Sequence, residues 1–308
     1  MKNYRKFGFY GMILSLSLLA FSCKKATISD AEYTTIEADN LQKYLLSHHI
    51  TVSPTSSGLY YLPTDTGNGI KPIISDVIIF TYSLRLENDS VIATNIDSVA
   101  KRHNLFTEGL FYIPFEYRLK WWFTGMQEGF QLMHESGKAS FILPSQLAYG
   151  KNGYPSLNVP AFTTIIVDVE LIKVIHDPVA YEKTQMDKFV TDSIPAGKVN
   201  EVLDSGVYHI IDTAGTGALP VNSNVVDVIY SASLLNGMVV TGKTPYSYTL
   251  GATSIIAGFD QGIRRMKKGE YAWVIIPYSQ GFGEQAAYPI NLPPFTTLVY
   301  YIHVVNIR

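Results

Sequence analysis

The chain has 308 residues, 47% of them hydrophobic, which suits about two ordinary domains with apolar cores. Its net charge is −2 and only 16% of its residues are charged, so no basic stripe is available for phosphate backbones. Nucleic acid is therefore excluded as the expected partner.

Residues 1–22 have the pattern of an export signal. Lys2, Arg5 and Lys6 precede an uncharged run that ends in A-F-S-C and is too short for a confident membrane span. This ending resembles a bacterial lipoprotein lipobox, although its Phe is bulkier than usual, and an ordinary signal-peptidase site is the alternative. Both interpretations make Cys23, the only cysteine, the first mature residue. We expect lipidation at Cys23 and anchoring in the bacterial cell envelope, with the outer membrane favoured.

A polar linker and a helix are expected in residues 23–54, with the helix from about residue 31 to residue 49 because apolar residues recur there at helical spacing. A second helix is expected within residues 176–202. Asp177 can cap this helix, and Pro178 suits its first turn. With one cysteine the exported chain has no intrachain disulfide, so each domain must depend on its apolar core.

Two copies of one pattern follow these helices, at residues 55–175 and 203–308. The stretch GMQEGFQLMHESGKASFILPSQLAYG begins at Gly125, and GFDQGIRRMKKGEYAWVIIPYSQGFG begins at Gly258, 133 positions later. The front halves of the copies differ by 148 positions, so the first copy carries 15 extra residues, which we place near 96–111. The chain therefore contains a duplicated domain.

Each copy ends in a strand with alternating apolar residues, as expected of a sheet with one buried face. In the second copy Phe259, Ile263 and Met266 lie at i, i+4 and i+7, on one face of a short helix. Many strands and one packed helix predict an α+β fold, with two tandem domains that are each preceded by a helical segment.

The repeated motifs resemble those of the FKBP-type peptidyl-prolyl cis/trans isomerases. They comprise G-F-D-Q-G with Met266, the strand that leads to Ile276-Pro277, the G-F-G turn and P-P-F-T-T-L-V-Y-Y. The resemblance covers nearly all of both copies. It implies that each domain is an antiparallel half-barrel sheet wrapped around a short helix.

The resemblance also implies a substrate pocket, and most of its expected residues are aromatic or aliphatic. In the second copy the expected catalytic residues are Tyr230, Tyr246, Ile255, Ile256, Phe259, Phe282, Tyr288 and Tyr300, with Val240 as a further substrate contact. In the first copy the matching residues are Tyr82, Phe115, Trp122, Phe123, Met126, Tyr149, Tyr154 and Val167. The first pocket is altered, because Met126 replaces an aromatic floor and Val167 an aromatic wall.

One position departs from the family in both copies. The family usually has a Phe-Asp pair after its early strand, whereas these copies have Val240-Thr241 and Ile92-Ala93. The resemblance implies that this Asp orients the ligand and supports turnover. We therefore expect weak activity, with the second copy as the better catalyst.

An apolar pocket is sufficient for this chemistry. Rotation about an X-Pro bond breaks amide resonance against a barrier of about 18–20 kcal/mol, and the twisted amide is less polar than the planar one. A water-poor pocket favours the twisted state, so no cofactor, nucleophile or metal is required. The seven histidines show no zinc-ligand spacing, which agrees with this expectation.

Three functions follow from these features. The first is a peptidyl-prolyl isomerase that acts on proline-containing exported polypeptides during their folding. The second is a non-catalytic lipoprotein that uses the same grooves to bind polypeptide or to assemble an envelope complex. The third and weakest is glycan binding by exposed aromatic residues.

Overall fold

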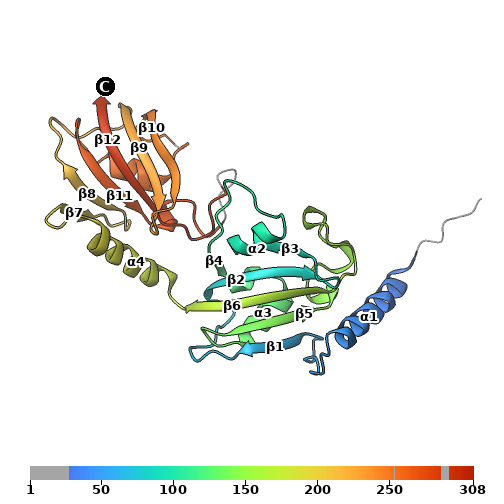
Figure 1. Cartoon of the computed structure of the whole chain (residues 1–308). Helices are drawn as coiled ribbons and strands as arrows, with labels where there is room; N and C mark the ends of the chain where they lie inside the picture. Colours follow the sequence, from blue (N-terminus) through green and yellow to red (C-terminus); the bar gives the residue numbers. More distant parts are fainter. Residues whose placement is uncertain (1–27, 253, 286–290) are drawn as a thin grey trace, which may run out of the picture.

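The computed structural model describes residues 28–252, 254–285 and 291–308, which form two antiparallel sheets and their helices (Figure 1). The first domain contains β1 (Tyr60–Asp65), β2 (Val77–Leu86), β3 (Val91–Thr94), α2 (Asp97–Arg102), β4 (Phe115–Arg118), α3 (Thr124–Leu132), β5 (Lys138–Leu143) and β6 (Ile165–Ile175). The second domain contains β7 (Val199–Val202), β8 (Tyr208–Thr213), β9 (Val225–Leu234), β10 (Val239–Thr249), α5 (Ala257–Ile263), β11 (Tyr271–Ile276) and β12 (Leu298–Ile307). The helices α1 (Asp30–Ser47) and α4 (Pro178–Ser193) precede the two domains.

The two sheets share one topology. The first has the order β1-β5-β6-β2-β3, with β4 also paired to β2, and the second has the order β10-β9-β12-β11-β8-β7. The predicted α+β fold is confirmed. The predicted insertion coincides with α2 and the loop after it, so the edge strand that is continuous in β10 is divided into β3 and β4 in the first domain.

A short helix packs on one face of each sheet, and its glycines permit close contact. A Cβ atom on Gly129 of α3 would lie 2.6 Å from the Phe141 ring on β5, and Gly262 of α5 lies against Val274 on β11 in the same way. Met126, at 0% exposure, belongs to the core beneath this contact. The glycines repeated 133 positions apart therefore set the distance between helix and sheet.

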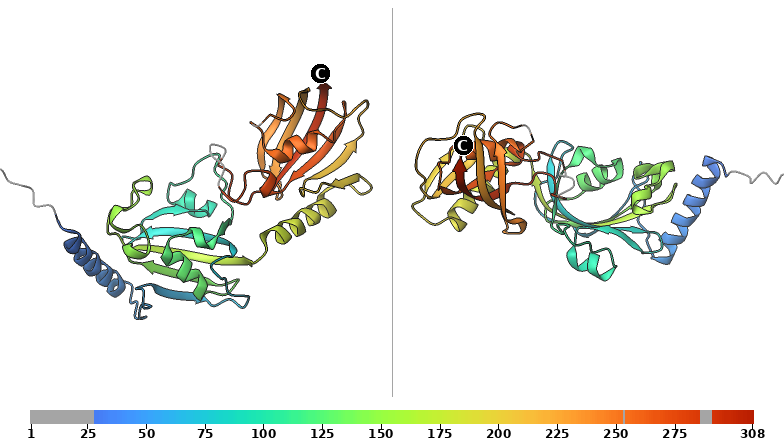
Figure 2. Two further views of the ribbon diagram at one scale, coloured as in Figure 1. Left: turned by 180° about the vertical axis from the view of Figure 1, so that it is seen from behind. Right: turned by 90° about the horizontal axis from the view of Figure 1, so that it is seen from above.

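The preceding helix packs against the opposite face of each sheet, at one end of its strands (Figures 1 and 2). Leu41, Tyr44 and Leu45 of α1 form a buried cluster with Tyr60, Ile142 and Ile166. The residues of α4 at the corresponding places, Met186, Phe189 and Val190, pack against Tyr208, Ile275 and Val299. Each sheet thus lies between two helices, because alternate strand residues point to opposite faces.

A buried glutamate fastens each of these outer helices to its domain. Glu37 of α1 accepts hydrogen bonds from the Ser145 hydroxyl at 2.7 Å and the Thr164 hydroxyl at 3.1 Å. Glu182 of α4 accepts one from the backbone N–H of Tyr278 at 2.7 Å and another from the Thr297 hydroxyl. The two anchors occupy equivalent places, so the duplicated unit includes its leading helix.

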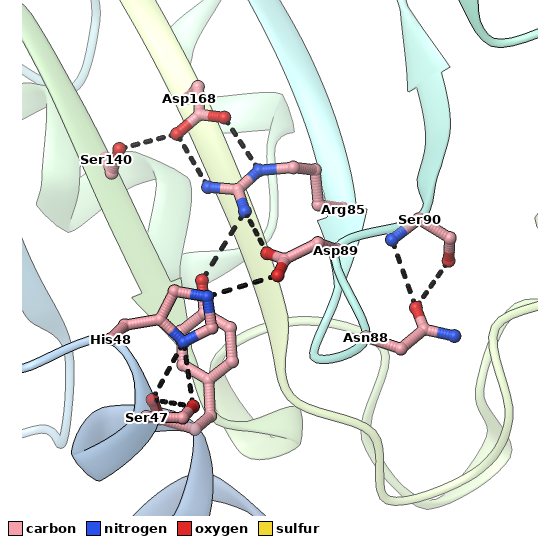
Figure 3. A network of polar contacts seen from close by, with 9 residues as sticks. Ser47, His48, Arg85, Asn88, Asp89, Ser90, Ser140 and Asp168 are labelled. Atoms are coloured by element: carbon pink, nitrogen blue, oxygen red, sulfur yellow. Dashed lines mark hydrogen bonds and ion pairs between the residues drawn. The ribbon is translucent and has the colours of Figure 1, made fainter.

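A polar network adds to the docking of α1 (Figure 3). Arg85 donates two hydrogen bonds to Asp168, at 2.8 and 3.1 Å, and also pairs with Asp89. His48, just after α1, reaches the same Asp89 at 3.1 Å. His48 therefore has a structural role at a helix end.

Within the described ranges, no helix combines the length and apolar character needed to cross a membrane. Cys23, the expected lipidation site, lies outside the described residues.

Candidate functional site

The second domain has an aromatic pocket of about 230 Å³ over α5. It is lined by Tyr230, Tyr246, Ile255, Phe259 and Tyr300, all of them expected from the sequence. Phe259 is 2% exposed and forms the floor, with the Tyr300 ring centroid at 5.1 Å and the Tyr230 ring centroid at 5.6 Å. Tyr246 is 38% exposed and stands at the rim. The strands β9, β10 and β12 and the helix α5 thus each supply a side chain to one apolar pocket.

Two tyrosines of this pocket, Tyr230 and Tyr300, stay neutral. Burial raises the pKa of Tyr300, and the nearby Tyr230 raises it further. The pKa of Tyr230 is raised by burial and by Tyr246. Because the pKa of each rises from an ordinary value near 10, no charge develops in the pocket at neutral pH.

A backbone donor precedes the pocket floor by three residues, since Ile256 is the N-cap of α5 and Phe259 lies in its first turn. The carbonyl of Ile256 accepts hydrogen bonds at the start of α5, from Phe259 and Asp260, while its N–H donates to no backbone carbonyl within the described part of the chain. An unpaired N–H at a helix start can donate to a carbonyl oxygen of a ligand. Ile256 can therefore orient an amide in the pocket.

Of the other residues expected in the second site, three lie near the pocket and one lies outside the residues that the structure describes. Val240, Ile256 and Phe282 are partly buried against the same core but do not line the cavity. Tyr288 lies outside the described residues.

The first domain groups its expected residues differently. Tyr82 lies 6.2 Å from both Phe115 and Trp122, measured between ring centroids, and the aromatic chain continues through Phe123 and Tyr149 to Tyr154. Burial raises the pKa of Tyr82 to about 12. Met126 and Val167, at 0% and 1% exposure, are core residues and offer no surface to a ligand.

The groove beside Tyr82 is covered by the chain itself. A cavity of about 260 Å³ remains there, enclosed by Tyr82 and Phe115 below, by residues 110–112 of the insertion, and by residues 291–293 of the second domain. Phe111 also packs against the core of the second domain. Residues 110–112, at the end of the expected insertion, and residues 291–293 thus form a contact between the domains beside Tyr82.

Comparison with known proteins agrees with this geometry. A sequence model of the FKBP-type peptidyl-prolyl cis-trans isomerases matches residues 69–172 and 217–305. The chain belongs to this family.

Several relatives of this FKBP-type chain have been described. The chain is 30% identical over 182 residues to the FKBP-type peptidyl-prolyl cis-trans isomerase FkpA of Escherichia coli, which covers 58% of this chain and 62% of that protein. It is 31% identical over 107 residues to FK506-binding protein 1 of Dictyostelium discoideum, covering 33% of this chain and 99% of that protein. The crystal structure of FkpA from E. coli is 27% identical, with a TM-score of 0.37, and that of the three FKBP domains of wheat FKBP73 is 20% identical, with a TM-score of 0.34. These structures cover 47% and 82% of this chain, and 63% and 96% of their own chains. The alignment with E. coli FkpA thus spans about three fifths of that relative.

Thr241 and Ala93 occupy the positions where the sequence resemblance led us to expect an acidic residue. Thr241 lies on β10, where it pairs with Ala232 of β9, and Ala93 on β3 pairs with Leu84 of β2. Neither side chain can carry a charge.

Sequence reasoning missed the polar residues at the junction of the two domains. Arg118 of β4 donates to Glu284 through two nitrogens, at 2.8 and 2.6 Å, although the residues are 166 positions apart. Glu116, two residues before Arg118, lines a cavity of about 320 Å³ between the domains. The sequence F-E-Y-R alternates aromatic and charged residues. This alternation is the one local pattern that indicates a polar face on the short strand toward the second domain.

Proposed function

We propose that this protein is a peptidyl-prolyl cis-trans isomerase of exported polypeptides, and that the second domain carries the site. The observation that supports this most directly is the open aromatic pocket of Tyr230, Tyr246, Ile255, Phe259 and Tyr300. The equivalent groove of the first domain is covered by residues 110–112 and 291–293. The pocket of the second domain is lined by that domain alone, whereas the groove of the first is shared with residues of the second, so we place the client proline in the second domain.

The pocket accelerates rotation by differential binding. A proline ring enters the apolar hollow over Phe259, and the Ile256 N–H donates to the carbonyl oxygen that precedes it. The walls favour the twisted, less polar amide over the planar one, and each ~1.4 kcal/mol of this preference gives a tenfold gain in rate. Neutral tyrosine hydroxyls at the pocket orient the peptide without the cost of burying a charge.

Replacement of Tyr246 by Ala tests this role in the full chain. Tyr246 is 38% exposed, so its loss removes a wall of the pocket with little effect on the core. We expect kcat/KM for isomerisation of an apolar-residue-proline peptide to fall about tenfold. Tyr33→Ala is the matched control, since Tyr33 is also 38% exposed but lies on α1. No catalysis by the unmodified chain would rule out the enzymatic role.

The second candidate is a binding protein without catalysis, which is favoured by Thr241 and Ala93 at the positions of the family's acid. It predicts that unfolded proline-containing chains bind with no acceleration of isomerisation. Binding that is lost in Tyr246→Ala, together with an inactive unmodified chain, would support this candidate over the enzyme.

We also propose a lipid anchor at Cys23, supported by the A-F-S-C ending of the signal segment. Cys23→Ser should move the protein from the membrane fraction to the soluble fraction of the envelope. An unchanged distribution would exclude the anchor.

A further inference from the structure

We propose that Arg118 of the first domain is a positioning residue for the pocket of the second domain. Arg118 holds the described parts of the connection between β11 and β12, residues 277–285 and 291–297, and Phe282 on this connection packs against the core beneath the pocket. This inference rests on the proposed function, because it assigns a role to Arg118 in that same site.

Arg118 binds the connection through hydrogen bonds of defined geometry. Its guanidinium makes two hydrogen bonds to the Glu284 carboxylate, at 2.8 and 2.6 Å, and the two side chains are only 16% and 32% exposed. A third bond goes to the carbonyl of Ser75 at 2.9 Å. A forked pair with this backing has a defined orientation, unlike a flexible ion pair at the surface.

Arg118 contacts both halves of the connection. It reaches Glu284 on the first half, and its guanidinium carbon lies 5.7 Å from the ring centroid of Phe295 on the second half. The halves are joined to each other, since the Phe295 N–H donates to the Gly283 carbonyl at 3.1 Å and the Gly283 N–H donates to Tyr278 at 2.8 Å. Gly283 directly follows Phe282, which packs against the same core as the floor residue Phe259, so the contacts of Arg118 end one or two residues from a neighbour of the pocket floor.

Apolar residues reinforce the same junction. Val77 and Ile175 of the first domain form one buried cluster with Tyr278 and Phe295 of the second. The left-handed backbone of Phe295, with φ of 56°, recurs at its counterpart Phe162, with φ of 53°, so this conformation belongs to the repeat and the junction adds only the contacts of the ring.

The internal repeat shows that this contact is particular to the junction. In the first domain the position 133 residues before Glu284 is Lys151, of opposite charge, which makes only an exposed 4.0 Å contact with Asp30. Phe162, the counterpart of Phe295, stacks instead on Tyr33 of α1, with 5.2 Å between ring centroids. The clamp therefore serves the second domain alone, which is the domain with the open pocket.

The test uses isomerase kinetics on the full chain with Arg118→Ala, Arg118→Lys and Glu284→Gln. We expect Arg118→Ala and Glu284→Gln each to lower kcat/KM about tenfold, mainly by raising KM, with less loss in Arg118→Lys. The double change Arg118→Glu with Glu284→Arg should restore part of the activity. Arg265→Ala is the matched control, since Arg265 forms an exposed ion pair with Glu201 elsewhere in the second domain.

Amide hydrogen exchange supplies a second readout that does not depend on catalysis. Exchange at Gly283 should accelerate in Arg118→Ala and Glu284→Gln but not in Arg265→Ala. An active unmodified chain whose kinetics and Gly283 exchange are unchanged by Arg118→Ala and Glu284→Gln would overturn the role of Arg118 alone. An inactive unmodified chain would overturn the proposed function, and the positioning role with it.

Discussion

Glu116 is an acidic residue in an environment that disfavours its charge. It lies on β4 and lines the cavity between the domains together with Glu182, Tyr181 and Gln185 of α4. Burial, together with the neighbouring Glu182, raises the pKa of Glu116 to about 8. Glu182 differs in that Thr297 and Tyr278 donate to its carboxylate, which partly offsets the effect of burial on its own pKa.

The shifted pKa of Glu116 predicts a stability that falls as the pH rises. From about pH 4.5 to about pH 8 the folded chain keeps a proton that the unfolded chain has released, so the free energy of unfolding decreases over this range. Glu116→Gln removes this cost and should be more stable than the unmodified chain by about 1–3 kcal/mol at pH 9, with no difference near pH 4. Urea unfolding at both pH values measures the effect. Parallel pH profiles for the two proteins would contradict it.

The helices and strands could be predicted from the sequence better than the junction between the domains. The glycines of α3 and α5, the alternating residues of β6 and β12 and the Asp177 cap of α4 are local patterns, and each recurs or is complete within one turn or strand. The family resemblance predicted the pocket residues of the second domain for the same reason, because the motifs that carry the resemblance are short and local. The cover over the first groove could not be predicted, because it depends on where residues 110–112 and 291–293 meet in space.

Glu37 shows the same limit at the level of a helix. It lies on α1 and binds Ser145, which is 108 positions away, so its burial leaves no local mark on the sequence. A single polar residue within an amphipathic helix is ordinarily solvated. The equivalent hydrogen bond from the Tyr278 N–H to Glu182 in the second copy can be recognised only in the structure, where the two residues lie together.

Removal of the Glu37 carboxylate should loosen α1 from the first domain. Glu37→Ala leaves the buried Ser145 and Thr164 donors without their acceptor, at a cost of about 1–3 kcal/mol. Amide exchange should accelerate along α1 while the strands of the first sheet stay protected. Asp39→Ala is the matched control, because Asp39 is an exposed carboxylate on the same helix. Equal exchange in the two variants would show that the apolar face alone docks α1.

The arrangement of the whole molecule depends on α4 and on the junction that Arg118 and Phe295 form. α4 connects the two sheets, and its apolar residues pack on the second sheet (Figure 1). Residues 110–113 of the first domain and 291–297 of the second meet across two cavities. The same contact between the domains therefore covers the groove of the first domain and supports the pocket of the second.

Loss of the Phe295 ring should release the two domains from a fixed relative position. Because Cys23 is the only cysteine, Cys23→Ser gives a background for spin labels at Lys138→Cys on β5 and Lys188→Cys on α4, both exposed. The labelled chain should give one narrow distance distribution.

Phe295→Ala removes the contacts of the ring with Val77, Ile175 and Arg118, so we expect a broader distribution between the same two labels. Phe162→Ala is the matched control, since Phe162 occupies the equivalent place in the first domain but stacks on Tyr33 of α1. If both variants keep the narrow distribution, the linkage through α4 alone fixes the domains, and the junction supports the pocket without setting the shape of the molecule.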